Sequence, residues 1–282
     1  MNLLNCYRKR GIVEVVRSIA VICSAITLAS CGKEPSEVVT EKQLEKSRPT
    51  FTDWCHDREN LSPEAKKTVE VLLKKARTID CYVASQKLGK LSSLYLSNKG
   101  IGDLKPLASL TNLTVLSLAS NQISDIKPLE SLTNLTLLSL ASNQISDIKP
   151  LESLTNLKGL SLDENQISDI TPLRALTQLI WVNLSNNQIR DTTPLRALTE
   201  LTSLNLSNNQ INDITPLQSL TKMRSLSLSN NEITNIKPLQ SLTNLIELDL
   251  SNNEIRDINP LLKSLPNLVG SPCRSGSCWE EW

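Results

Sequence analysis

The sequence repeats itself every 22 residues through most of its length, and this period constrains the fold more than any other feature. One copy, Leu132 to Ser153, reads LTNLTLLSLASNQISDIKPLES. Regular copies open at Leu110, Leu132, Leu154, Leu176, Leu198, Leu220 and Leu242, and a less regular copy opens at Leu88. Repeats of this length stack into a solenoid, in which each copy contacts only its neighbours. The 282 residues therefore need not be divided among several cores.

Alternating leucines in each copy predict a short strand with one buried face. In the copy that opens at Leu132, the expected inward positions are Leu135, Leu138, Leu140, Ile145, Ile148, Leu151 and the following Leu154. Stacked copies would form one parallel sheet, with neighbouring strands ~4.8 Å apart. A core made of leucine and isoleucine agrees with the aromatic content of only 3%.

Polar residues recur at fixed places in the turn that follows each strand. One asparagine per copy is expected to donate to and accept from the turn backbone of neighbouring coils, which is a structural role. These residues are Asn121, Asn143, Asn165, Asn187, Asn209, Asn231 and Asn253. Asp125, Asp147, Asp169 and Asp213 precede Ile-x-Pro-Leu and are expected to cap a short turn. One carboxylate per coil is a poor calcium cage, so we expect no metal and no cofactor.

The repeated pattern LxxLxLxxNxIxDIxPLxxLTx resembles the leucine-rich repeats of the internalin and SDS22-like class. The resemblance covers Leu88 to about Leu261. It implies an α/β repeat solenoid, a curved array with parallel strands on the concave face and 3₁₀ turns on the convex face. Lys99 departs from the pattern at the first ladder asparagine, and Thr192 departs at an inward isoleucine. The sequence offers no reason for Thr192.

The first 30 residues are typical of an export signal. Arg8, Lys9 and Arg10 precede an apolar run from Ile19 to Ala29, which is shorter than the ~20 residues of a spanning helix. Leu28-Ala29-Ser30-Cys31 resembles a bacterial lipoprotein lipobox, which implies cleavage before Cys31 and acylation of its thiol. An ordinary signal peptide with a chance cysteine is the alternative. We expect residues 1–30 to be removed and residues 31–49 to be a flexible, lipid-anchored tether.

Four further cysteines flank the repeats and favour an oxidising compartment. They allow three pairings, of which the local one joins Cys55 to Cys81 and Cys273 to Cys278. Residues 50–87 are expected to be a helical N-terminal cap, residues 88–263 eight repeats, and residues 264–282 a C-terminal cap, because solenoid ends expose core. His56 beside Cys55 suggests a nucleophilic pair. A disulfide at Cys55 would remove that thiol, so we expect no enzyme.

The concave positions between the inward leucines are the candidates for binding. Val115, Leu137 and Trp181 are expected to neighbour one another on consecutive strands, and Tyr95 extends this patch. Glu247 and Asp249 would make the far end acidic. Exposed aromatic and aliphatic side chains on a rigid sheet are candidate interface anchors. Sequence drift on an idle surface is the other interpretation.

The charge balance gives no reason to expect nucleic acid as a partner. The formal net charge is +1, and without the four basic residues and one acidic residue before Cys31 it is −2, from 26 basic and 28 acidic residues. We expect a monomer, anchored through lipid to the cell envelope, that binds an unidentified protein. In a Gram-negative cell we expect it on the outer membrane. The alternatives are a structural spacer without a specific ligand and an SDS22-like phosphatase-regulatory scaffold, which the export signal opposes.

Overall fold

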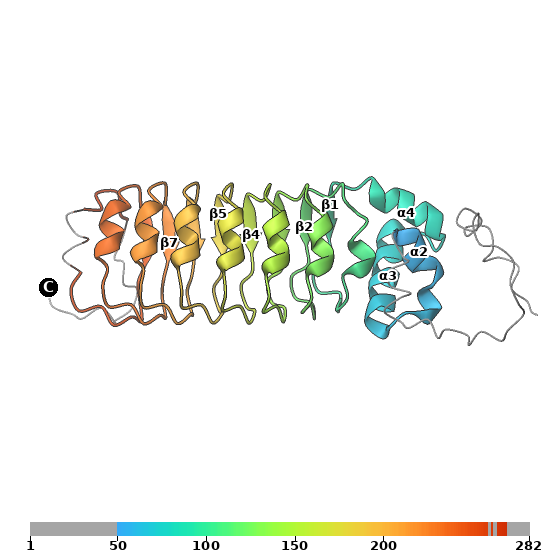
Figure 1. The fold of residues 1–282 in the computed structure, drawn as a ribbon, viewed down its shortest axis with the longest axis horizontal. Coiled ribbons are helices and arrows are strands. Elements are labelled where there is room, and N and C mark those ends of the chain that lie inside the picture. The colour runs from blue at the N-terminus through green and yellow to red at the C-terminus, as the bar shows by residue number, and fades with distance from the viewer. Residues whose placement is uncertain (1–49, 259–260, 262–263, 270–282) are drawn as a thin grey trace, which may run out of the picture. The chain divides into compact units, whose positions relative to one another are not determined.

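The structure is a computed structural model that describes residues 50–258, 261 and 264–269. All of these residues fall within one compact unit, Glu45–Trp282, in which helices are followed by stacked coils (Figure 1). The predicted export signal, Cys31, the tether as far as residue 49 and the cysteines Cys273 and Cys278 lie outside the described residues.

Each coil contributes one strand of three residues, and the eight described strands form one parallel sheet in sequence order. They are β1 (Ser93–Tyr95), β2 (Val115–Ser117), β3 (Leu137–Ser139), β4 (Gly159–Ser161), β5 (Trp181–Asn183), β6 (Ser203–Asn205), β7 (Ser225–Ser227) and β8 (Glu247–Asp249). The register pairs equivalent positions, as in Leu116 with Leu138. Equivalent side chains therefore form rows across the sheet, and the predicted repeat solenoid is confirmed.

Short 3₁₀ helices lie opposite the sheet, so each coil has a strand on one face and a turn on the other. They are η3 (Lys105–Leu107), η4 (Lys127–Ser131), η5 (Lys149–Ser153), η6 (Thr171–Ala175), η7 (Thr193–Ala197), η8 (Thr215–Ser219) and η9 (Lys237–Ser241). The leucines and isoleucines predicted to face inward are buried between the two faces. Consecutive coils pack through the same few aliphatic side chains, so an aromatic side chain is not needed between the two faces.

The ladder asparagines join each coil to the one before it. Asn165 Nδ2 donates to Leu140 O of the preceding coil at 3.0 Å and to Leu162 O of its own coil at 3.1 Å. Its Oδ1 accepts the N–H of Ile145 at 2.9 Å. The other six ladder asparagines make the same set of bonds. Each carboxamide thus satisfies backbone groups that the tight bend leaves unpaired.

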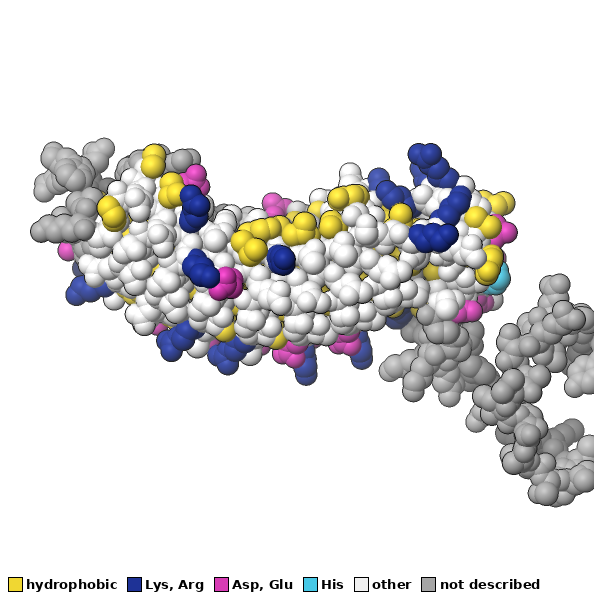
Figure 2. Space-filling view, turned by 90° about the horizontal axis from the view of Figure 1, so that it is seen from above, with side chains coloured by type: hydrophobic (Ala, Val, Ile, Leu, Met, Phe, Trp, Pro, Cys, Tyr) yellow, Lys and Arg dark blue, Asp and Glu magenta, His cyan; other side chains and the backbone are white. Residues whose placement is uncertain are grey.

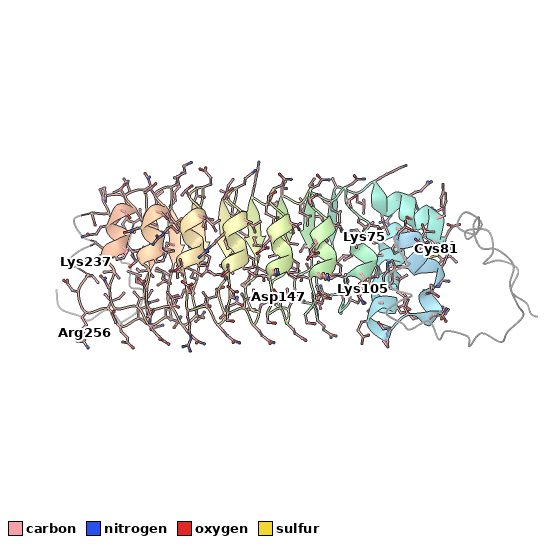
Figure 3. All side chains as sticks on the ribbon, viewed as in Figure 1. Lys75, Cys81, Lys105, Asp147, Lys237 and Arg256 are labelled. Atoms are coloured by element: carbon pink, nitrogen blue, oxygen red, sulfur yellow. A yellow bond between two sulfur atoms is a disulfide. The ribbon has the colours of Figure 1, made fainter. Side chains whose placement is uncertain are left out.

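The repeated aspartates stabilise the start of each 3₁₀ turn from just outside it. Oδ1 of Asp147, a residue labelled in Figure 3, accepts the N–H of Lys149, two residues on, at 2.8 Å, which is an Asx turn. Asp169 and Asp213 accept in the same way from Thr171 and Thr215. Bonds from the side chain and then the backbone of these threonines lower the pKa of both carboxyls. The favoured charged form keeps these turns capped at neutral pH.

Three α-helices form the N-terminal cap, which the sequence predicts to be helical. They are α2 (Phe51–His56), α3 (Pro63–Ala76) and α4 (Cys81–Gly89), with the 3₁₀ helix η2 (Arg58–Asn60) between the first two. Helix α3 begins with favourable capping chemistry, because Ser62 Oγ accepts the N–H of Ala65 and Pro63 occupies the first turn. Helix α4 runs past the predicted boundary at residue 87, so Leu88 lies in its last turn.

Hydrogen bonds and burial attach the cap to the first coil. Thr68 of α3 is fully buried, and its hydroxyl donates to Asp103 O at 2.7 Å. Asn112 Nδ2 donates to Gly89 O at 2.6 Å. Phe51 and Leu72 are buried in the same core as the leucines of the coils. The cap therefore covers apolar surface that the first coil would otherwise expose to water.

Thr192 and the left-handed turn positions were not explained by the sequence. The buried Thr192 hydroxyl donates to Asp213 O of the next coil at 2.9 Å, so this substitution for isoleucine leaves no polar group unpaired. The residue before each ladder position adopts positive φ, between 53° and 57°. These residues are Asn98, Ser120, Ser142, Glu164, Asn186, Asn208, Asn230 and Asn252. Asparagine tolerates this conformation better than serine or glutamate does.

This difference predicts opposite effects of two reciprocal substitutions on stability. Glu164→Asn should raise the free energy of unfolding by roughly 0.5–1 kcal/mol, because Asn is less strained at positive φ. Asn208→Glu should lower it by about the same amount. Urea unfolding followed by circular dichroism measures both, with unchanged m-values as the check on the unfolded state. If the two variants had the same free energy of unfolding, the assignment of backbone strain to residue 164 would be contradicted.

Candidate binding face

The sheet places four predicted binding residues on its solvent-facing side. Tyr95 on β1 is 59% exposed, Leu137 on β3 is 38% exposed and Trp181 on β5 is 37% exposed. Val115 on β2 pairs directly with Leu137 and is half-buried. Apolar side chains at these positions contribute little to the core, which the inward leucines already fill.

Val115, Leu137 and Trp181 do not lie on consecutive strands as predicted, because β4 intervenes with Gly159. The structure shows how this gap is closed. A Cβ built on Gly159 would lie 2.3 Å from both Cε2 and Nε1 of Trp181, so the indole covers this glycine. Gly159 is consequently buried although it belongs to the outward row. The absence of a side chain at residue 159 leaves room for the indole over β4, whose Gly159 pairs with Leu137.

We call Tyr95, Val115, Leu137, Ile180 and Trp181 the apolar strip. Ile180, which precedes β5, is 42% exposed and was missed from the sequence. Other copies have threonine at the equivalent position, such as Thr136 and Thr202, so the apolar Ile180 could have been noticed as a departure from the pattern. Figure 2 shows hydrophobic side chains in a row along the hollowed side of the array. The strip therefore presents several exposed apolar side chains along the array.

The two predicted acidic residues at the far end differ in their surroundings. Glu247 is exposed and accepts a hydrogen bond from Ser225 Oγ at 2.9 Å. Asp249 is partly buried, and its Oδ1 accepts from the Ser251 backbone N–H at 3.1 Å and from its hydroxyl at 2.6 Å. Asn205 bonds Ser207 in the same way. Asp249 thus supports its own turn, and Glu247 is the more accessible charge.

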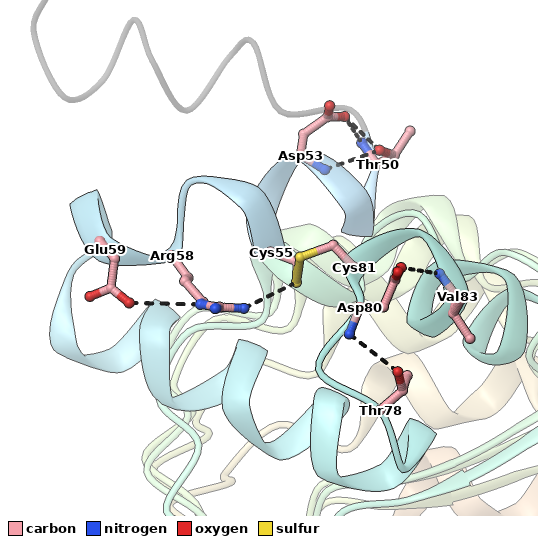
Figure 4. The surroundings of a disulfide bond; sticks show 9 residues. All are labelled: Thr50, Asp53, Cys55, Arg58, Glu59, Thr78, Asp80, Cys81 and Val83. Carbon is pink, nitrogen blue, oxygen red and sulfur yellow. Dashed lines mark hydrogen bonds and ion pairs between the residues drawn. A yellow bond between two sulfur atoms is a disulfide. The ribbon is translucent and has the colours of Figure 1, made fainter. Parts of the chain in front are cut away.

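The cysteine–histidine pair of the cap is not arranged for nucleophilic chemistry. Cys55 is bonded to Cys81 with an S–S distance of 2.04 Å and a Cα–Cα distance of 5.5 Å (Figure 4). This is the N-terminal bridge of the local pairing expected from the sequence. With its sulfur in a disulfide, Cys55 has no thiolate to act as a nucleophile.

Residues 50–258, 261 and 264–269 contain neither a candidate metal site nor a candidate membrane span. No group of three or more His, Cys, Asp or Glu side chains is placed there to hold a metal ion. No helix in the same residues is long and apolar enough to cross a membrane. Among the described residues, the apolar strip is therefore the candidate site that the sequence and the fold both single out.

The repeats match a family described as Leucine Rich repeats (2 copies), over residues 90–131, 133–175, 177–219 and 221–269. These segments make up more than half of the chain. The chain belongs to the leucine-rich-repeat family. No curated relative of similar sequence was found.

Solved leucine-rich-repeat structures share this fold. Internalin C2 of Listeria monocytogenes is 36% identical, with a TM-score of 0.65 over 71% of this chain and 88% of that one. A leucine-rich-repeat protein of Leptospira interrogans is 31% identical, with a TM-score of 0.61 over 66% and 50% of the two chains. A plant receptor kinase ectodomain from Arabidopsis thaliana is 25% identical, with a TM-score of 0.55 over 64% and 27%. The fold is internalin-like, and neither family nor neighbours indicate a catalytic activity.

The contact between Trp181 and Gly159 predicts the effect of adding one methyl group. Gly159→Ala should push the indole away from the sheet and increase its exposure to water, because the new Cβ occupies the place of the ring. Acrylamide quenching of tryptophan fluorescence measures this exposure. The fluorescence of the same protein with Trp181→Phe is subtracted, so that only the signal of Trp181 remains. Ser203→Ala, on the other side of Trp181, is the control and should leave quenching unchanged. Unchanged quenching in Gly159→Ala would contradict the packing.

Proposed function

We propose that this leucine-rich-repeat protein is anchored by lipid in the cell envelope and binds another protein through its apolar strip. The observation that carries the proposal is the indole of Trp181, which lies over Gly159 and remains partly exposed. Large apolar side chains held on a rigid surface lose little conformational entropy on binding, which is why they serve as interface anchors. The inward leucines already account for the core, so folding does not require this exposed strip.

A solved neighbour supports a protein as the class of partner. The plant receptor kinase ectodomain was crystallised in complex with Casparian strip integrity factor 2. That binding belongs to the plant protein, and only a quarter of the residues are identical. For the present chain we infer the class of ligand and leave the identity of the partner to experiment.

Support for an exported location comes from the cap as well as from the signal-like N-terminus. The Cys55–Cys81 disulfide closes a loop between α2 and α4. Structural disulfides persist in oxidising compartments and are rare in the cytosol. Acylation of Cys31 would add several lipid chains at one residue, and more than one chain is needed for stable anchoring. Residues 31–49 would then connect the lipid to the cap.

Site-specific photo-crosslinking in the native cell tests the binding face. A benzophenone amino acid at Leu137 of the full chain should capture a distinct protein, and the same group at Glu152 on the convex turn η5 should not. Trp181→Ala should weaken the interaction by about 2 kcal/mol, the size typical of a buried anchor. Equal capture from both faces would contradict the proposal. Capture of only a second copy of this chain would favour the structural-spacer alternative.

Metabolic labelling with palmitate tests the lipid anchor separately. The full chain should incorporate the label, and Cys31→Ser should abolish it because no thiol remains at the lipobox position. Cys23→Ser is the matched control, since Cys23 lies within the apolar run and should be removed with the signal peptide. Labelling of the Cys31→Ser variant, or an unlabelled parent chain, would overturn the anchor without affecting the proposal for the concave face.

A further inference from the structure

A groove lies between the cap and the first coil, at the N-terminal end of the apolar strip. One wall is helix α3, whose Lys67, Val71, Lys74 and Lys75 recur at helical spacing on one face. The other wall comes from β1 and the turn after it and includes Tyr95 and Lys99. The groove has a volume of about 940 Å³. Figure 2 shows Lys and Arg side chains gathered at this end of the hollowed side, and Figure 3 places Lys75 near the first coil.

The charges of the groove are unbalanced. Lys67, Lys74, Lys75, Arg77 and Lys99 line it together with a single carboxylate, that of Glu70, which gives a net of +4. None of these five cationic side chains has a hydrogen bond or ion pair to another described residue. Lysines elsewhere in the cap are engaged: Lys66 pairs with Glu59 at 2.7 Å, and Lys87 donates to Ala76 O. Like charges gathered on one surface repel one another, so a bound anion would relieve the repulsion within this cluster.

The floor of the groove is apolar, and this restricts the kind of anion that fits. Val71 packs partly buried against the core, Leu96 is buried, and Tyr95 is an exposed apolar side chain of the same lining. Tyr95 also belongs to the apolar strip, so cationic and apolar surfaces adjoin on one face. A ligand that contacts both must carry acidic groups next to apolar groups. An extended polypeptide meets this requirement, whereas a polyanionic glycan does not. A flat membrane surface cannot follow the hollowed side of the array.

The opposite end of the face carries both signs of charge. Glu247 is exposed on β8, seven strands away from Tyr95 on β1. Lys222 and Arg224 line a second hollow near β7, where Lys222 pairs with Glu200 at 2.7 Å. Because cations and carboxylates are mixed there, whereas the groove has a net charge of +4, an acidic segment is attracted more strongly to the groove.

We propose that the groove between α3 and β1 binds an acidic segment of the protein partner, whose adjoining apolar residues lie on the apolar strip. This inference rests on the proposed function, because it names the chemistry of the partner for the same face. It extends the site from the sheet to the cap. It also predicts strong salt dependence, since solvent-exposed charges are screened within about 8 Å at physiological ionic strength.

Selection from a displayed library of random peptides tests this chemistry with the full chain purified in detergent. Peptides of about 12 residues suffice, because they reach ~40 Å when extended. Selected peptides should combine clustered Asp and Glu with apolar residues and should bind more weakly in high salt. The triple variant Lys67→Glu, Lys74→Glu and Lys75→Glu should weaken their binding at least about tenfold, because it removes attraction and adds repulsion.

A variant with the same change in net charge controls for non-specific attraction. Lys127→Glu, Lys149→Glu and Lys237→Glu place three carboxylates on the convex turns and should alter peptide affinity less than about twofold. Thermal unfolding of both triple variants verifies that they fold; if the first does not, the single variant Lys75→Glu replaces it.

The possible outcomes separate this inference from the proposed function. Selected peptides that lack acidic residues but lose affinity in Trp181→Ala would overturn the inference and leave the proposed function standing. Peptides insensitive to both Trp181→Ala and the groove variant, or no selected peptide at all, would count against both. Tighter binding of heparin or of phosphatidylglycerol vesicles than of any selected peptide would assign the groove to a glycan or to a membrane surface and would also overturn the inference.

Discussion

The carboxamide ladder is the interaction on which the rest of this structure depends. A coil of 22 residues must reverse direction within a few residues, and each bend leaves backbone N–H and C=O groups without partners inside the coil. One asparagine per coil satisfies groups of two coils at once, as Asn165 does with Leu140 O and the Ile145 N–H. An unsatisfied buried group would cost about 1–3 kcal/mol. The ladder thereby sets the register in which the leucines stack.

The same dependence on neighbours explains the cap. A coil at the end of the array lacks a partner on one side, so its leucines would face water. Helix α3 closes this side with apolar residues such as Leu72 and with the buried Thr68, whose hydroxyl donates to Asp103 O of the first coil. The disulfide between Cys55 and Cys81 ties α2 to α4 and limits the freedom of the unfolded cap. The cap and the coils consequently share one core.

The period of 22 residues made the solenoid, the inward leucines and the ladder predictable, because each role recurs at one position of the copy. Features that arise from a contact between two different positions of the copy do not recur along the chain, so they were not predictable in this way. The contact of Trp181 with Gly159 joins unlike residues of neighbouring coils. Helix α2 and all but the end of α4 lie outside the repeat, and both helices are short, so no recurring position marks them. The cationic groove combines residues of the cap and the first coil that no sequence pattern relates.

Repetition also gives a way to separate binding from folding in this protein. The stacking of coils uses the inward row and the ladder, so a residue of the outward row that contains Gly159 and Trp181 can change without removing a contact of either. Gly159 and Trp181 are two departures in that row, and they fit each other, because a side chain at residue 159 would displace the indole. Independent drift would not be expected to match two neighbouring positions in this way. The cations near Tyr95 likewise contribute nothing to the buried core, and their mutual repulsion would be relieved by a bound anion. Features that folding does not require, and that adjoin on one face, support the proposal that one partner contacts them together.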